Sequence, residues 1–354
     1  MRDETPVRGR LIAALRAGAR GLFPGYFALV MATGVISIAC EHLGMRTIAL
    51  ALVAVNWVAY PTLCALTLAR AIRFPRLLML DLFDHRKAPG FFTLVAGTCV
   101  LGTQNVVVLG LREVAIPLWW LGVGLWFVVM YAFFTAVTVR VRKPLIGQGI
   151  NGAWLIVSVA TQSVVVLRVA IDASAAPPPA IQFQMITMFM IGSMLYLAII
   201  PLIFYRLTFA TLKHAEFSPP YWINMGAVAI SALAGSLLIQ RAEIWPLVGQ
   251  LLPVIQGFTV LFWATATWWI PFLFTLMIWR YFWKGDRIRY EPAVWSMIFP
   301  LGMYTTSTFQ FDRAMGYGFL DPIPGVLVFV ALAAWAPAAV GLLRRVVGAV
   351  STAE

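Results

Sequence analysis

Ten apolar runs, each long enough to cross a bilayer, constrain the fold of this chain more than any other feature of its sequence. A transmembrane helix needs roughly 20 predominantly apolar residues. We place ten such spans at 23–41, 46–72, 90–110, 114–139, 150–171, 180–205, 219–240, 247–282, 292–311 and 322–345. Because 61% of the residues are hydrophobic and only 11% are charged, few remain for a domain outside the membrane. The sequence therefore predicts an all-α integral membrane protein embedded in a lipid bilayer.

The distribution of basic residues predicts the orientation of the chain. A net charge of +12 is compatible with a nucleic-acid partner, but all except five of the 26 Lys and Arg residues lie on one side of the predicted spans. By the positive-inside rule that side is cytoplasmic, so we expect both termini in the cytoplasm and no nucleic acid. We divide the chain into a basic N-terminal segment (1–22), a ten-helix transmembrane domain (23–345) and a C-terminal tail (346–354), and we expect it in the plasma or inner membrane.

The ninth span carries the most informative interruption. Its apolar run is broken by Phe299, Pro300 and Gly302, and a proline inside a helix removes a backbone hydrogen bond and produces a kink. Such a break at membrane depth is tolerated where protein or a water-filled cavity surrounds it. Phe299, Gly302 and Thr306 fall on one helical face. We interpret this face as a pore wall closed by the Phe299 ring, with ordinary packing of the ring as the alternative.

An internal repeat supports the same interpretation. We align the odd-numbered spans on an aromatic residue near each cytoplasmic end: Phe27, Phe92, Trp154, Trp222 and Trp295. Two helical turns later the residues are all small: Gly34, Cys99, Thr161, Ala229 and Gly302. One turn after the anchor, Met31, Ala96, Ser158, Gly226 and Phe299 include a single aromatic residue. Repeats are common in transport folds, so we predict five helical hairpins arranged quasi-fivefold around a central pore. Tight helix packing is the alternative explanation of the small residues.

The residues assigned to the pore are mostly small or carry a hydroxyl group. We predict kinks or close approaches at Pro300, Gly302, Gly34, Gly97 and Gly226. The predicted lining contains Met31, Thr33, Ala96, Cys99, Ser158, Thr161, Ala229 and Thr306. Hydroxyl groups can replace part of the hydration shell of an anion without holding it too tightly to leave. The even-numbered spans carry bulkier apolar side chains, so we expect them on the outside, against lipid.

One arginine lies near the outer end of each predicted hairpin. These are Arg46, Arg112, Arg168, Arg241 and Arg313, and each has an acidic residue nearby in sequence. They could form a mouth that attracts anions. The alternative is a set of solvated surface pairs, each worth little. Arg168 is the strongest candidate for a functional role, because it is embedded in an apolar run.

Motifs for enzymatic chemistry are absent from the sequence. There is no Walker loop, no GxGxxG after a strand, no HExxH and no Ser/His/Asp arrangement. The three cysteines and three histidines show neither disulfide nor metal-ligand spacing. We therefore expect no enzyme activity, no cofactor and no metal. No acidic residue lies well inside a span, which weighs against a buried carboxylate relay for protons.

Two stretches resemble a known family. Gly25–Ile38 (GYFALVMATGVISI) and Trp295–Thr306 (WSMIFPLGMYTT) are similar to the first and ninth helices of the tellurite-resistance/dicarboxylate transporter (TDT) family. That family is similar to the plant slow anion channels of the voltage-dependent anion channel superfamily. The resemblance implies ten helices in five hairpins around a pore, a homotrimer with one pore per protomer, and a gating phenylalanine that falls on Phe299. Family substrates include chloride, nitrate, sulfite, tellurite and C4-dicarboxylates, so the resemblance does not select one.

Three hypotheses for function follow. The first is an anion channel or carrier for small inorganic anions or C4-dicarboxylates, occluded by Phe299. The second is a proton-coupled carrier of malate, other C4-dicarboxylates or sulfite. The third is a membrane sensor or scaffold whose helices pack without a continuous pore.

Overall fold

The computed structural model describes residues 15–287 and 290–351, without the side chains of 349–350. Within these residues the protein is helical and has no strand. The first fourteen residues of the predicted N-terminal segment and the last three of the predicted tail lie outside the described part. The long helices are α2 (Ala28–His42), α3 (Arg46–Arg73), α5 (Phe92–Gln104), α6 (Arg112–Val139), α8 (Ile156–Ile171), α9 (Pro179–Phe209), α10 (Ile223–Ile239), α12 (Leu252–Ile278), α13 (Trp295–Met315) and α14 (Pro322–Ser351). Shorter helices are α4 (Pro75–Leu82), α7 (Ile146–Gly149) and α11 (Pro246–Gln250).

Nine helices among the described residues are long and apolar enough to cross a membrane, and they coincide with nine of the ten predicted spans. The remaining prediction, 292–311, corresponds to α13. This helix has 21 residues but carries an unbroken run of hydroxyl groups from Tyr304 to Thr308, followed by Gln310, Asp312 and Arg313. The side chains of most of its residues are nonetheless buried. Neighbouring helices, rather than apolar composition, therefore shield α13 from lipid.

The long helices form two layers. Helices α2, α5, α8, α10 and α13 contact one another in cyclic order, and each also packs against the long helix that follows it: α3, α6, α9, α12 and α14 respectively. The apolar windows of α2, α5, α8 and α10 are 78–94% buried, whereas those of the following helices are only 17–50% buried. Since lipid tails are as apolar as these side chains, the exposed layer suits contact with the bilayer.

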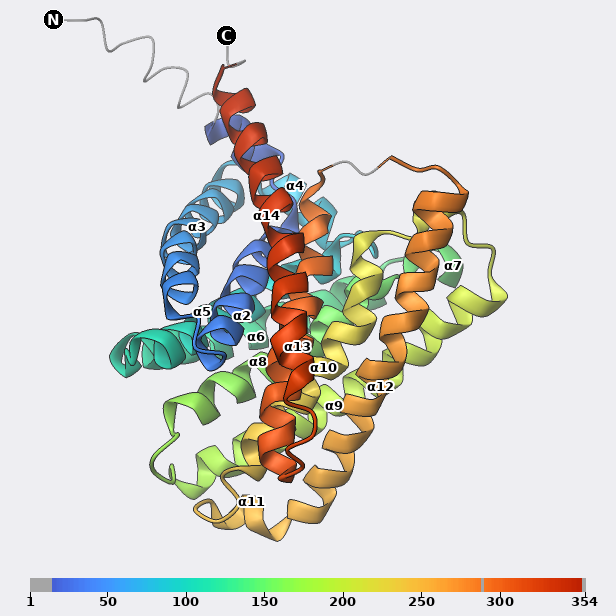
Figure 1. The fold of residues 1–354 in the computed structure, drawn as a ribbon. Coiled ribbons are helices and arrows are strands. Elements are labelled where there is room, and N and C mark those ends of the chain that lie inside the picture. Colours follow the sequence, from blue (N-terminus) through green and yellow to red (C-terminus); the bar gives the residue numbers. More distant parts are fainter. Residues whose placement is uncertain (1–14, 288–289, 352–354) are drawn as a thin grey trace, which may run out of the picture.

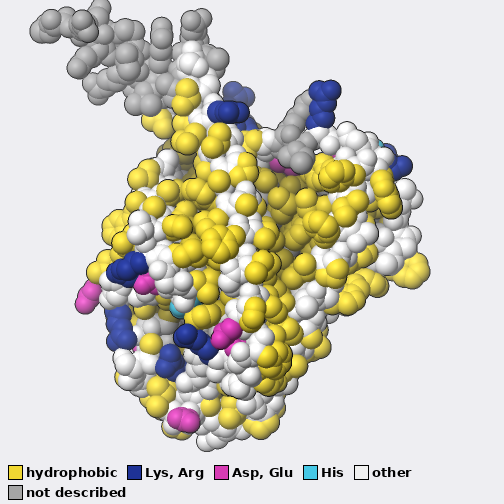
Figure 2. All heavy atoms as spheres, viewed as in Figure 1, with side chains coloured by type: hydrophobic (Ala, Val, Ile, Leu, Met, Phe, Trp, Pro, Cys, Tyr) yellow, Lys and Arg dark blue, Asp and Glu magenta, His cyan; other side chains and the backbone are white. Residues whose placement is uncertain are grey.

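The outer surface agrees with this division. Helices α12 and α14 run along the outside of the bundle, and the described chain begins and ends at the same end of it (Figure 1). Figure 2 shows that hydrophobic side chains cover most of this face, with charged side chains gathered toward its two ends. This distribution is the one expected of a protein whose middle lies in hydrocarbon and whose ends lie in water.

Each inner helix is preceded by one turn of 3₁₀-helix. The turns are Pro24–Phe27, Ala88–Phe91, Gly152–Leu155, Pro219–Trp222 and Pro292–Val294, and they contact one another in the same cyclic order as the helices. Two of the contacts need glycine because the backbones nearly touch. A Cβ on Gly90 would lie 2.8 Å from the backbone nitrogen of Gly25, and one on Gly152 would lie 2.2 Å from the carbonyl oxygen of Pro220. The ring of turns therefore fixes the spacing of the inner helices at this end.

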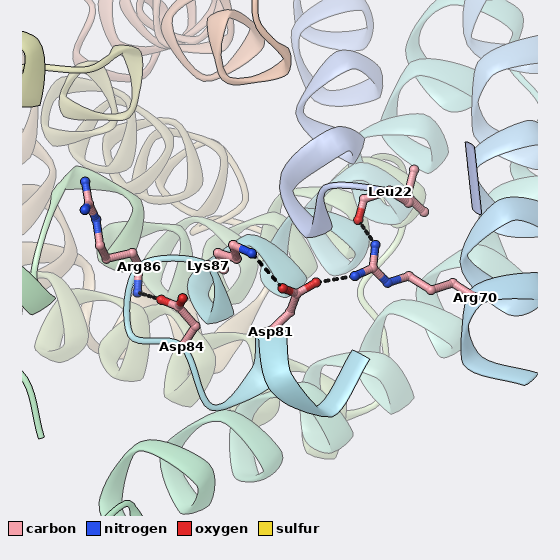
Figure 3. Close-up of polar contacts among 6 residues, drawn as sticks. All are labelled: Leu22, Arg70, Asp81, Asp84, Arg86 and Lys87. Carbon is pink, nitrogen blue, oxygen red and sulfur yellow. Dashed lines mark hydrogen bonds and ion pairs between the residues drawn. The ribbon is translucent and has the colours of Figure 1, made fainter. Parts of the chain in front are cut away.

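A buried ion pair attaches α4 to the end of α3 (Figure 3). The Arg70 guanidinium donates to the carboxylate of Asp81 and to the carbonyl oxygen of Leu22. Lys87 adds a second cation, with its Nζ 3.0 Å from Asp81 Oδ1. The side chains of Arg70 and Asp81 are only 8% and 10% exposed. Asp81 therefore joins α4 to the end of α3 and to Lys87, which precedes the turn Ala88–Phe91.

Replacing Asp81 with asparagine is expected to lower the free energy of unfolding by about 2 kcal/mol, because the buried Arg70 loses a charged hydrogen-bond partner. Chemical denaturation in mixed detergent micelles would measure this. The matched control is Asp84→Asn, since the one described donor to the Asp84 carboxylate is the exposed backbone N–H of Arg86 at 2.8 Å. Equal stability of the two variants would contradict a structural role for the Arg70–Asp81 pair.

Candidate functional site

A cavity of about 390 Å³ is enclosed by all five inner helices. Each helix, with the π-turn that extends α5, contributes residues at the same i, i+3, i+7 spacing. The fifteen residues are Val35, Ile38 and His42; Val100, Thr103 and Val107; Ser163, Val166 and Ala170; Ile230, Leu233 and Leu237; and Met303, Thr306 and Gln310. This spacing is one face of an α-helix. Equivalent faces of the five helices therefore surround a common space.

The shared spacing also identifies the residues that lie one turn beyond the cavity along the central axis of the five inner helices. One helical turn toward the N-terminal ends, the register passes through Met31, Ala96, Val159, Gly226 and Phe299. These residues do not line the cavity, and the four with side chains are at most 2% exposed. Phe299 is the single aromatic residue of this level. The level therefore combines one large ring with four smaller residues, just beyond the end of the cavity.

Glycines bring α13 close to its two neighbours at this level. A Cβ on Gly226 of α10 would lie 2.7 Å from Cγ of Pro300. A Cβ on Gly302 would lie 2.8 Å from side-chain atoms of Val35 and Ile36 on α2. Larger residues at either position would push α13 outward and move Phe299 with it.

Two arginines reach the opposite end of the cavity. Arg112 Nη2 donates to Ser174 Oγ at 3.0 Å, and Arg241 Nη1 donates to the carbonyl oxygen of Ala173 at 2.6 Å. Both line the cavity, and neither forms an ion pair with any described residue. Burial lowers the pKa of Arg241 by desolvating its charged form. The end of the cavity away from Phe299 thus carries two guanidinium groups without acidic partners.

The family of this chain follows from a sequence comparison that covers nearly its whole length. The profile of the voltage-dependent anion channel family matches residues 22–343. The chain belongs to this family. The predicted resemblance is therefore confirmed. The prediction of a multi-pass membrane protein from a family of anion channels and transporters is confirmed as well.

This member of the voltage-dependent anion channel family is similar to proteins from bacteria, archaea and fungi. An uncharacterized membrane protein of Mycobacterium tuberculosis is 35% identical over 151 residues, 43% of this chain and 76% of the relative. An uncharacterized transporter of Methanocaldococcus jannaschii is 26% identical over 155 residues, 44% of each chain. The sulfite efflux pump SSU1 of Trichophyton rubrum is 21% identical over 339 residues, 88% of this chain and 87% of the pump.

Three of the hydroxyl residues that the sequence predicts to line the pore instead contact outer helices in this member of the family. Thr33 Oγ1 accepts from Trp335 of α14 at 2.9 Å, and Thr161 Oγ1 accepts from Trp126 of α6 at 2.8 Å. Ser158 Oγ donates to the carbonyl oxygen of Gly192 on α9 at 2.8 Å. None of the three lines the cavity. Their hydrogen bonds connect the inner layer to the outer one.

The remaining predicted residues divide between the cavity and helix contacts. Thr306 lines the cavity, and Met31 and Ala96 belong to the level of Phe299. Cys99 and Ala229 are fully buried without lining the cavity. A Cβ on Gly34 would lie 2.6 Å from Val100, and one on Gly97 would lie 3.3 Å from Phe27, so the two glycines permit close packing of α5 with α2 and with the turn before it.

Three of the five predicted mouth arginines have other partners. Arg46 pairs with Glu41 at 2.5 Å and Arg168 pairs with Asp172 at 2.6 Å. The Arg168 guanidinium also lies over the ring of Trp119, and that of Arg313 lies 4.0 Å from the ring centre of Phe309. None of these three lines the cavity. The structure thus brings together Arg112 and Arg241 at the mouth.

Sequence reasoning missed an amide and imidazole cluster at the mouth. Gln240 Nε2 donates to Gln310 Oε1 at 3.0 Å, and Gln310 Nε2 lies 3.1 Å from His42 Nε2. The His42 ring stacks on Phe309 with centroids 4.9 Å apart. The i, i+3, i+7 spacing shared by the odd spans was the signal that could have found His42 and Gln310, since both stand at its third position.

Proposed function

We propose that the protein conducts small anions across the membrane along the axis of its five inner helices, and that Phe299 occludes this path. One observation carries the proposal. The face that lines the cavity at fifteen equivalent positions continues directly to the level of Phe299, where the other four residues are smaller. A single aromatic ring at such a level can close a pore by steric exclusion and dewetting.

The proposed architecture has ten spans that form five hairpins in a quasi-fivefold arrangement. The cyclic contacts of the inner helices and the pairing of each with its successor support it, and α13 is taken as the tenth span. In this proposal 23–345 is the transport domain and both termini face the cytoplasm of a plasma or inner membrane. A homotrimer with one pore per protomer rests on the resemblance to the TDT family.

The substrate proposed is a small inorganic anion or a C4-dicarboxylate. The sulfite efflux pump among the relatives, aligned over most of both chains, adds sulfite to the candidates. The described residues that line the cavity include no Asp or Glu, which favours passive conduction over a carboxylate-based proton relay. A proton-coupled carrier of malate or sulfite is the second candidate. The cavity itself weighs against a sensor or scaffold without a path.

A flux panel with purified protein in liposomes distinguishes the candidates. Vesicles are loaded with chloride, nitrate, sulfite or malate, and efflux is followed with and without an imposed proton gradient. We expect efflux that does not require the gradient. Efflux that occurs only with the gradient would favour the coupled carrier. Absence of efflux for all four anions, in the wild type and in Phe299→Ala, would favour the sensor.

A further inference from the structure

The hydroxyl groups deep in the cavity donate hydrogen bonds to backbone carbonyl oxygens. The Thr103 hydroxyl donates to the carbonyl oxygen of Cys99 at 3.0 Å, and that of Ser163 donates to Ala160 at 2.7 Å. The Thr306 hydroxyl lies 3.4 Å from the carbonyl oxygen of Val35. These hydroxyl hydrogens are directed at backbone carbonyl oxygens, so they are less available to a ligand than an unpaired donor is. The rest of the deep wall is made of Val, Ile, Leu, Ala and Met side chains.

The available donors are concentrated at the mouth. Arg112 and Arg241 are bound to consecutive residues of the loop between α8 and α9, so their guanidinium groups meet at one place. Arg241 Nε is buried and has no hydrogen-bond partner among the described residues. A buried N–H of a charged group that lacks an acceptor is costly. A planar or tetrahedral oxyanion can accept two hydrogen bonds from one guanidinium.

The neighbouring amides offer an anion less than the arginines do. Gln240 Nε2 donates both to the side chain and to the backbone carbonyl of Gln310. The Gln310 amide nitrogen is within hydrogen-bond distance of His42. These contacts hold the amides against the wall. The two guanidinium groups therefore remain as the main anchor for negative charge.

We propose that this cavity binds an amphiphilic organic monoanion, with its carboxylate or sulfonate held between Arg112 and Arg241 and its apolar body packed against the deep wall. The volume of about 390 Å³ lies within the range of small-molecule sites. A single anionic group satisfies the two guanidinium groups, and the rest of the bound molecule lies among valines and the other apolar side chains of the deep wall. The binding does not depend on conduction. Block of inorganic anion flux by the bound molecule rests on the proposed function.

Benzenesulfonate is a suitable probe because it stays ionised at all ordinary pH values. Binding to the full-length protein in nanodiscs is measured by isothermal titration calorimetry. Benzenesulfonamide has the same body without the charge, and methanesulfonate has the charge without the body. We expect both to bind at least about tenfold more weakly than benzenesulfonate, which corresponds to a loss of about 1.4 kcal/mol.

Variants locate the site. We expect Arg112→Gln and Arg241→Gln each to weaken benzenesulfonate binding by roughly 10- to 100-fold, as for loss of a hydrogen bond to a charged group. Arg46→Gln is the matched control, because Arg46 lies at the same end of the bundle but is paired with Glu41. Val166→Thr, which keeps the side-chain volume, should weaken benzenesulfonate without changing methanesulfonate.

Several outcomes would overturn the proposal. Undetectable binding of benzenesulfonate to the wild type would do so, as would equal binding by the wild type and both arginine variants. Equal binding of methanesulfonate and benzenesulfonate would remove the role of the apolar wall. Thermal unfolding of each variant in nanodiscs separates a lost site from a lost fold. Since all these readouts are binding constants, they stand whether or not the protein conducts anions.

Discussion

Phe299→Ala is expected to raise anion efflux from liposomes by roughly tenfold or more, which requires only that about 1.4 kcal/mol be removed from the barrier. The ring is 1% exposed and is the single aromatic residue at its level of the axis. Met31, Ala96, Val159 and Gly226 occupy the equivalent positions on the other inner helices. Truncation to a methyl group would therefore remove the largest side chain of this level and extend the cavity past it.

The matched control for Phe299 lies on the same helix. Phe311 is also buried, but its ring stacks on Trp263 of α12 with centroids 5.0 Å apart, toward the outer layer. Phe311→Ala should destabilise the protein through lost packing, by about 3 kcal/mol or more, without raising efflux. Phe299→Leu should give an intermediate efflux. If Phe299→Ala left efflux unchanged, or if Phe311→Ala raised it equally, Phe299 would not be the occluding residue.

Gly152→Ala is expected to lower the free energy of unfolding by about 3 kcal/mol or more, because overpacking at a rigid contact is costly. The new methyl group would lie 2.2 Å from the carbonyl oxygen of Pro220 and 2.7 Å from Cα of Tyr221. Both are backbone atoms, so no side-chain rotation can relieve the clash. The 3₁₀ turns of α8 and α10 must separate, and the ring of turns opens.

Gly124→Ala on α6 is the control for Gly152→Ala. A Cβ at Gly124 would meet no other atom within 4 Å, and alanine favours a helix over glycine by up to about 1 kcal/mol. Gly124→Ala should therefore be neutral or slightly stabilising. Size-exclusion profiles and thermal unfolding in detergent report both effects. A Gly152→Ala protein as stable as the wild type would mean that the turns are not held in close contact.

The internal alignment of the odd spans placed four of the five inner helices in the same register relative to the cavity, and the structure explains the exception. Phe27, Phe92, Trp222 and Trp295 each stand eight residues before the first cavity residue of their helix, whereas Trp154 stands nine before Ser163. The Trp154 indole donates to the carbonyl oxygen of His85, between α4 and α5, and to that of Gly149, the last residue of α7. These two hydrogen bonds fix the position of Trp154, which therefore stands one residue earlier relative to the cavity than the other four anchors. For this reason the alignment selected Ser158, whereas the residue one helical turn before Ser163 is Val159.

The small residues two turns after the anchors fall one residue short of the cavity face in four helices. Gly34 and Gly302 accordingly pack against neighbouring inner helices, where a Cβ would collide with Val100 and with Val35. The alternative offered by the sequence, tight packing, describes these two positions. Small residues at these positions indicate close approach between helices. The face toward the axis is indicated instead by the i, i+3, i+7 spacing that the five inner helices share.

The sequence by itself determined the class of fold, the positions of nine membrane-spanning helices, the family, and that Phe299 is the single aromatic residue at its aligned position. Hydrophobic length is a local property, and the bilayer imposes it on each helix separately. The tertiary structure decided which hydroxyl groups turn toward outer helices, which two arginines remain unpaired, and where His42 and Gln310 meet. These outcomes depend on the rotation of each helix about its axis, and that rotation is fixed by contacts between segments far apart in the chain.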